Sequence, residues 1–250
     1  MKEYSIVVPA YNESDKITAT LTQITSFMNT FSQSYEVIVV DDGSVDSTVQ
    51  KVSEYVADNP NVLLVKNPHK GKGVAITTGV AKADGQYIYL CDADLSAPIS
   101  ELKKLSVWLK DNDFDIVIAS REGHGAQRIN EPIYRHIMGR VFNFFVRTLV
   151  LPGIQDSQCG FKLFKGEQAK SIFSKLIIYN TQSKVIETPY MGAFDVEVLY
   201  IAKKMKLKVK EVPVTWKYVK TTRLSPLKDS IKMLLDIIKI KVNGLKGAYL

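Results

Sequence analysis

The sequence predicts an α/β protein with an open, mostly parallel sheet that is covered by helices on both faces. Short apolar runs rich in Val and Ile alternate with amphipathic stretches throughout the first half of the chain. The runs are continuous rather than alternating in polarity, which is typical of parallel strands buried on both faces. A helix between successive strands indicates right-handed crossover connections within one sheet.

The first half supplies strands and helices in alternation. Strands are expected at residues 4–10, 35–42, 61–67, 87–94 and 114–121. Helices are expected at residues 13–31, 46–58, 70–83 and 99–111. In such a sheet ligands bind beyond the carboxyl ends of the strands, so a functional site should lie there.

The second half is less regular. An apolar helix with several basic residues is expected at 131–151, and the segment "IQDSQCGFKLF" follows it. Further elements are expected as helices at 166–176 and 194–206, a polar loop at 179–190 and a strand at 209–219.

Residues 1–225 are expected to form one domain, and residues 226–250 a basic, amphipathic C-terminal helix. One stripe of this helix carries four lysines beside an apolar face: Lys228, Lys232, Lys239 and Lys246. Such a helix either lies on a membrane surface or packs against the domain, and both interpretations stay open here.

Composition narrows the class of protein. A net charge of +7 and a pI near 9.2 favour an anionic partner. Cys91 and Cys159 lie in apolar segments, which favours buried thiols in a reducing compartment. The N-terminus lacks the features of a signal peptide, and no apolar stretch is long enough to span a bilayer. We therefore expect a cytoplasmic protein without a transmembrane segment.

Two carboxylates follow a hydrophobic strand in "YIYLCDADLSAP", with no basic residue beside them. Residues two apart on an extended segment point the same way, so Asp92 and Asp94 can face one side together. Paired carboxylates repel unless a proton or a cation lies between them, and hard oxygen ligands favour Mg²⁺ or Mn²⁺. The alternative is a pair of turn and N-cap residues before the helix at 99–111.

The other strand ends also carry polar groups. "VDDGS" places Asp41 and Asp42 after the second strand, where an acidic side chain can accept hydrogen bonds from a nucleoside. "HKGKGVA" departs from the Walker pattern, and no GxGxxG follows the first strand. Lys72, between two glycines at a helix start, still suits anion binding, although a solvated basic turn fits equally well.

Basic residues in the second half are candidates for gripping phosphate. The set consists of Arg121, Arg128, Arg135, Lys220 and Arg223. Guanidinium forks match phosphate geometry, although any one of them alone is an ordinary surface charge. Asp156, in a loop after the apolar helix, is a candidate general base or orienting carboxylate.

Together these motifs resemble a known family. "VVPAYNE", "VVDDGSVDST", "DADLS.P", "D.QCGFKLF" and "FDVEVLYIA" resemble the inverting nucleotide-sugar transferases of glycosyltransferase family 2, which have the GT-A fold. Within it, the chain is most similar to the dolichyl- or polyprenyl-phosphate β-glucosyltransferases, which are related to dolichyl-phosphate mannose synthases. The resemblance extends from Ile6 to the "VTWKYVKTTRLSP" segment.

The resemblance implies roles for residues at matching positions. The nucleotide sugar would be bound by Pro9, Ala10, Tyr11, Glu13, Asp41, Asp42, Lys72 and Asp92. Mg²⁺ or Mn²⁺ would be held by Asp92 and Asp94. The acceptor phosphate would be gripped by Arg121, Arg135 and either Arg223 or Lys220, and Asp156 matches the carboxylate usually assigned to catalysis.

The implied reaction is inverting transfer of a hexose, first of all glucose from UDP-glucose, to dolichyl or polyprenyl phosphate. Ser96 stands where mannose synthases tend to have Gln, which favours the glucosyl type. The implied partners are a nucleotide sugar, the lipid phosphate and the cytosolic surface of a membrane, and whether the chain forms a homo-oligomer stays open.

Three alternatives remain. GDP-mannose could be the donor, or a saccharide could be the acceptor of a soluble enzyme of the same family. A non-catalytic basic protein that binds nucleotides or nucleic acid is the remote one, and nucleic acid is not an expected partner because acidic motifs occupy the strand ends.

Overall fold

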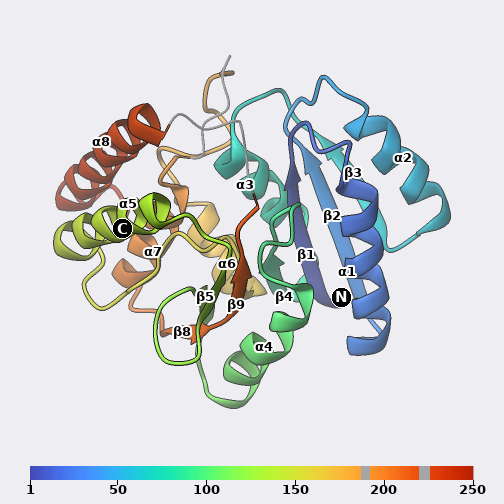
Figure 1. The fold of residues 1–250 in the computed structure, drawn as a ribbon, viewed down its shortest axis with the longest axis horizontal. Coiled ribbons are helices and arrows are strands. Elements are labelled where there is room, and N and C mark those ends of the chain that lie inside the picture. Colours follow the sequence, from blue (N-terminus) through green and yellow to red (C-terminus); the bar gives the residue numbers. More distant parts are fainter. Residues whose placement is uncertain (187–191, 220–225, 250) are drawn as a thin grey trace.

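The computed structural model describes residues 1–186, 192–219 and 226–249, the last range without the side chains of 226–229. Over these residues the chain forms a seven-stranded sheet in the order β3-β2-β1-β4-β7-β5-β8 (Figure 1). Its strands are β1 Lys2–Ala10, β2 Tyr35–Asp41, β3 Val62–Lys66, β4 Gly85–Leu90, β5 Ile116–Ser120, β7 Lys162–Lys165 and β8 Val209–Pro213. β7 runs antiparallel to both β4 and β5, and the other neighbours are parallel. The predicted mostly parallel α/β sheet is confirmed.

Helices cover both faces of this sheet. One face packs against α1 Ile17–Phe31, α2 Thr48–Asp58 and α4 Leu102–Asp111. The opposite face packs against α3 Lys72–Lys82, α6 Gly166–Phe173 and α7 Phe194–Lys204. Alternate residues of β1 belong to the hydrophobic cores on opposite faces of the sheet, since Ile6 and Val8 face α1 while Val7 faces α3. Both faces of the strand are therefore apolar, which explains the continuous hydrophobic runs.

Close packing fixes α3 against the sheet at Gly79. A Cβ atom at this position would lie 2.4 Å from Cγ1 of Val7, so a larger residue would push the helix away from β1. This close contact positions α3, and with it Lys72 at the start of the helix, relative to β1.

The strand expected at 209–219 is two strands in the structure. β8 ends at Pro213 and pairs with β5, whereas β9 Thr215–Lys217 pairs with β6 Gln127–Ile129 in a separate two-stranded sheet. Proline lacks the N–H group that would continue the ladder, so the chain leaves the large sheet there. As a result, Trp216 of β9 comes to lie beside residues at the carboxyl ends of the parallel strands.

The C-terminal helix α8 Pro226–Leu245 lies beside α5 Ile133–Leu149 (Figure 1). Its inner face is tied to the domain, because Oη of Tyr179 donates to Asp236 at 2.6 Å. Just after the helix, Oη of Tyr249 donates to Glu197 at 2.8 Å. Its outer face leaves apolar side chains exposed, namely Ile231, Leu235, Ile238, Val242 and Leu245. The helix thus packs on the domain and still presents an apolar surface.

Lysines of the predicted stripe follow this outer side. Lys239 is exposed and pairs with Asp236 at 3.0 Å, and Lys232 and Lys246 are also exposed. The side chain of Lys228 lies outside the described residues. Among the described helices none is both long and apolar enough to cross a membrane.

Candidate active site

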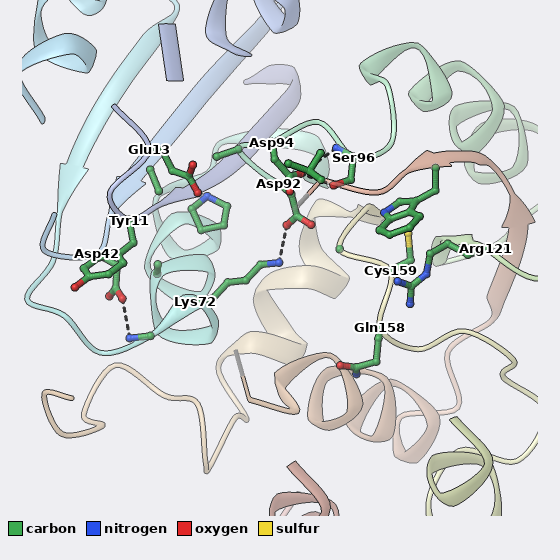
Figure 2. A pocket seen from close by; sticks show the side chains of 18 of the residues that line it. Tyr11, Glu13, Asp42, Lys72, Asp92, Asp94, Ser96, Arg121, Gln158 and Cys159 are labelled. Atoms are coloured by element: carbon green, nitrogen blue, oxygen red, sulfur yellow. Dashed lines mark hydrogen bonds and ion pairs between the residues drawn. The ribbon is translucent and has the colours of Figure 1, made fainter. Parts of the chain in front are cut away.

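A pocket of about 220 Å³ opens at the carboxyl ends of the parallel strands (Figure 2). It is lined by the ends of β1, β2, β4 and β5, the start of α3, and residues Gln158, Cys159 and Gly160. Ten of the predicted site residues line it: Pro9, Ala10, Tyr11, Glu13, Asp42, Lys72, Asp92, Asp94, Arg121 and Arg135. Asp41 and Asp156 do not, and Arg223 and Lys220 lie outside the described residues.

One end of the pocket is built around Asp42. Its carboxylate accepts hydrogen bonds from the backbone N–H of Lys70 at 3.0 Å and of Gly71 at 2.8 Å, and it contacts Nδ1 of His69 at 2.8 Å. The imidazole stacks on Tyr11 with ring centroids 4.1 Å apart. A flat aromatic surface beside a buried carboxylate suits a nucleobase.

The adjacent Asp41 does not line the pocket and instead stabilises the loop that follows β2. Its Oδ2 accepts from the N–H groups of Gly43 and Ser44, both at 3.0 Å. Gly43 has φ +77°, and a Cβ there would lie 2.8 Å from the backbone nitrogen of His69. Because this close approach requires glycine, Asp41 and Gly43 together shape the wall that presents His69.

Asp92 and Asp94 face the middle of the pocket together with Lys72. Nζ of Lys72 lies 2.6 Å from Oδ1 of Asp92, and Oδ1 of Asp94 accepts from Ser96 Oγ at 2.6 Å. Burial disfavours the charge on Lys72, but the carboxylates of Asp92 and Asp195 more than offset this and raise its pKa. Burial, and then the charge of Asp92, raise the pKa of Asp94.

These residues fit a divalent cation. Asp92 and Asp94 are partly buried carboxylates that repel each other, and a cation between them would offset the burial and the repulsion that raise the pKa of Asp94. Gly160 packs directly against Asp92, since a Cβ there would lie 2.2 Å from Oδ2, so a larger residue would displace this carboxylate. No third acidic, His or Cys side chain joins the pair within the described part of the chain.

The other end of the pocket is formed by Arg121. Its Nε and Nη2 donate to the two oxygens of Asp156, each at 2.8 Å, and its backbone N–H donates to the same carboxylate at 2.8 Å. The guanidinium lies over the ring of Trp216, 5.3 Å from its centroid. Burial opposes ionisation of Asp156, yet Arg121 more than offsets it and lowers the pKa of this carboxyl to about 2.

Asp156 is therefore a fully engaged, fully buried carboxylate. Its Oδ1 also accepts from the backbone N–H of Gln158 at 3.3 Å, and its own N–H donates to Glu211 at 2.9 Å. The carboxylate oxygens of Asp156 therefore contact Arg121 and the backbone of Gln158, and Asp156 does not line the pocket. A carboxylate in this state orients a cation and is a poor proton acceptor at neutral pH.

Arg135 and Arg128 differ in how they are used. Arg135 lines the pocket and lies over Tyr218, 5.1 Å from the ring centroid. Arg128 forms ion pairs with Glu122 at 2.8 Å and Glu131 at 2.7 Å, and it does not line the pocket. Of the arginines proposed for gripping phosphate, Arg121 and Arg135 thus share the pocket.

A buried ion pair supports the floor of the pocket. Lys162 is completely buried, donates to Asp195 at the start of α7, and donates to the carbonyl oxygen of Cys159 at 2.5 Å. Lys162 is on β7, next to β4, so the pair joins the sheet to α7 and to the loop that contacts Asp92.

Sequence reasoning missed His69, Trp216 and Gln158 as pocket residues. His69 belongs to the "HKGKGVA" segment, in which the glycine-flanked lysine is the residue that suggests anion binding. Trp216 follows the proline that ends β8, and only the turn at Pro213 signals that this strand changes direction. Gln158 lies in the motif that contains Asp156, yet nothing in its spacing marks it.

Residues 5–173 match glycosyl transferase family 2. The chain belongs to this family. It is 35% identical over 258 residues to a dolichyl-phosphate beta-glucosyltransferase of Dictyostelium discoideum, covering 98% of this chain and 76% of that protein. It is 34% identical over 264 residues to the human protein of that name, covering 99% and 78%.

The family assignment agrees with the fold. Glucosyl-3-phosphoglycerate synthase from Mycobacterium tuberculosis, solved with Mn²⁺, UDP-glucose and phosphoglyceric acid, matches with a TM-score of 0.66 at 18% identity. The match covers 99% of this chain and 80% of that one. This likeness places the chain among proteins with the GT-A fold.

Proposed function

We propose that this family 2 transferase moves glucose from UDP-glucose to dolichyl or polyprenyl phosphate, and that the product is β-linked. The observation that carries the proposal is that one pocket contains both the carboxylates of Asp92 and Asp94 and the guanidinium groups of Arg121 and Arg135. Asp156, the buried acid beside Arg121, is already fully engaged. Such a pocket suits an acceptor that enters as an ionised phosphate and needs orientation rather than deprotonation.

The donor would lie along the strand ends. Tyr11, His69 and Asp42 offer a flat, hydrogen-bonding place for the nucleobase, and Lys72 lies beside the position proposed for the diphosphate. Asp92 and Asp94 would hold Mg²⁺ or Mn²⁺. When bound, the cation would offset the charge that the diphosphate gains as it leaves.

The acceptor would enter from the arginine end. An ionised phosphate oxygen attacks C1 of the sugar, the bond from C1 to the diphosphate breaks, and its electron pair leaves with UDP. Arg121 and Arg135, each backed by an aromatic ring, would bind the acceptor phosphate and align this oxygen. One direct displacement inverts the configuration at C1.

The lipid part of the acceptor would stay in a membrane on which the protein rests. The α5–α8 face is defined by exposed apolar residues of both helices: Ile133, Tyr134, Ile137, Val141, Phe144, Phe145, Leu149, Ile231, Leu235, Ile238, Val242 and Leu245. Arg140 and Arg147 of α5 and Lys232, Lys239 and Lys246 of α8 are exposed on the same helices. Apolar side chains with basic ones around them suit the surface of an anionic bilayer.

The relatives support the choice of substrates. The Dictyostelium and human proteins named dolichyl-phosphate beta-glucosyltransferase align over nearly all of this chain. The test is transfer of labelled sugar from UDP-glucose, and in parallel from GDP-mannose, to a short polyprenyl phosphate with Mg²⁺ or Mn²⁺. Chelator-sensitive product from UDP-glucose is expected. Product from GDP-mannose alone would overturn the donor, and product only with a saccharide acceptor would overturn the lipid acceptor.

A further inference from the structure

Gln158 lies in a short segment, residues 156–160, that joins the two ends of the pocket. At one end of the segment Asp156 holds Arg121. At the other end Gly160 contacts Asp92 so closely that a Cβ would lie 2.2 Å from Oδ2. On the proposed function, the sugar lies between the diphosphate near Asp92 and the acceptor phosphate near Arg121, so this segment runs alongside it.

The segment is rigidly held. Glu211 of β8 accepts from the backbone N–H groups of Gln155 at 2.8 Å and Asp156 at 2.9 Å. The buried Lys162 binds the carbonyl oxygen of Cys159 at 2.5 Å. A segment fixed on both sides can present a side chain with the precision that recognition of a sugar needs.

Within this segment one side chain offers hydrogen bonds to the pocket. Asp156 is saturated, Ser157 is buried and does not line the pocket, and Cys159 is a buried thiol. Gln158 lines the pocket, and Figure 2 shows it extending from below Arg121 toward the side on which Lys72 lies. Its Nε2 is shielded from solvent and has no hydrogen-bond partner among the described residues.

An amide nitrogen without a partner in a structured pocket calls for an acceptor. The last torsion of a glutamine side chain is broad, so the amide can turn its donors toward a ligand at little cost. A sugar hydroxyl both accepts from an amide N–H and donates to an amide oxygen. We propose that Gln158 binds a hydroxyl group of the donor hexose and so determines which sugar the enzyme accepts; the inference rests on the proposed function.

The experiment compares Gln158→Met with Gln155→Met. Methionine keeps the length of the side chain and removes its hydrogen bonds. Gln155 is an exposed residue three positions earlier in the chain, just before this segment and outside this pocket, which makes it a matched control. Binding of UDP and of UDP-glucose, each with Mn²⁺, is measured by calorimetry, and thermal unfolding verifies that both variants are folded.

The Gln158 variant should bind UDP as the wild type does and lose roughly three- to tenfold in affinity for UDP-glucose, the value of one neutral hydrogen bond. Among UDP-2-deoxyglucose, UDP-3-deoxyglucose, UDP-4-deoxyglucose and UDP-xylose, which remove the four free hydroxyls of glucose one at a time, one analogue should bind weakly to the wild type and suffer no additional loss in the variant. That analogue identifies the hydroxyl. Equal changes for UDP and UDP-glucose, or none for either, would overturn the inference.

The outcome is separable from that of the proposed function. Sugar recognition is measured by binding, whereas the proposed function is tested by transfer to lipid phosphate. If the wild type transfers glucose and Gln158→Met shows no selective loss for UDP-glucose, the inference alone fails. If the wild type binds UDP-glucose with the predicted dependence on Gln158 and uses another acceptor, the lipid acceptor alone fails.

Discussion

Arg121 and Asp156 are both candidate functional residues by sequence, and the ion pair between them gives them different roles. Both were candidates for direct roles in chemistry. The structure saturates Asp156 and leaves Arg121 in the pocket over Trp216. We therefore interpret Asp156 as the residue that positions Arg121.

Asp156→Asn should reveal this pair through stability and its dependence on pH. An unfolded aspartate has a pKa of about 3.9, while Asp156 in the fold titrates at about 2. A lowered pKa stabilises the fold fully above the unfolded value, and about 2 kcal/mol should be lost as the pH falls from ~4 to ~2. Removing one partner of a buried pair costs about 3–5 kcal/mol at neutral pH.

The measurement is urea unfolding of the wild type and Asp156→Asn at several pH values. The variant should be less stable at neutral pH and lose less free energy of unfolding on acidification. Asp58→Asn, an exposed surface change, is the control. A variant that lost as much stability as the wild type in the acid range would contradict the assignment.

Asp94→Asn tests the proposed metal ligands, Asp92 and Asp94. If Asp94 holds the cation, the variant should lose transfer activity by roughly 100-fold or more, because a bound metal contributes several kcal/mol to the stabilisation of a leaving group. Mn²⁺ titration followed by calorimetry should show weakened binding in the presence of UDP. The exposed Asp113→Asn is the control. Unchanged Mn²⁺ binding in Asp94→Asn would argue against the metal site.

At the scale of elements, how much the sequence predicts depends on how local the signal is. β1 and β2 were predictable because their continuous apolar runs reflect burial on both faces. β7 was not, because its four residues begin with Lys162 and read as a polar segment. A lysine is tolerated inside the sheet because Asp195, more than thirty residues later, pairs with it. A partner so far away in the sequence produces no periodic pattern from which the strand could be predicted.

Lys162→Met should therefore destabilise the fold by leaving Asp195 buried without its partner. Breaking a buried pair on one side costs about 3–5 kcal/mol, whereas replacing both members by apolar residues is often close to neutral. Denaturant unfolding should accordingly show that Lys162→Met combined with Asp195→Leu recovers much of the loss. A double variant as unstable as the sum of the two single changes would exclude a coupled pair.

At the scale of the whole molecule, the pocket and the α5–α8 face are connected through α5, which packs against α8. Arg135 is on α5 and lines the pocket, while the same helix carries exposed Phe144. α8 is bound to the domain through Asp236, and Tyr249 just after the helix is bound to Glu197, while α8 carries exposed Ile238. The arrangement would bring the arginine end of the pocket near a membrane surface. The expected boundary at residue 226 stays a prediction, and the packing of α8 favours treating it as part of the domain.

Phe144→Asp and Ile238→Asp test this surface. Each replaces an exposed apolar side chain by an acidic one, so binding to phosphatidylglycerol vesicles should fall about tenfold as apolar burial is lost and repulsion is added. Val107→Asp, an exposed position on α4, is the control and should bind like the wild type. Sedimentation with vesicles measures the effect, and equal binding of all three variants would contradict a membrane role for the α5–α8 face.

The central claim is that the acceptor arrives already ionised and that no side chain needs to remove a proton from it. The most direct measurement compares polyprenyl phosphate with the corresponding free alcohol as acceptors for labelled UDP-glucose, under otherwise identical conditions. The account predicts β-linked product from the phosphate and none above background from the alcohol. Comparable transfer to the alcohol would contradict it, because the enzyme would then need a base that Asp156, bound to Arg121, is poorly placed to provide.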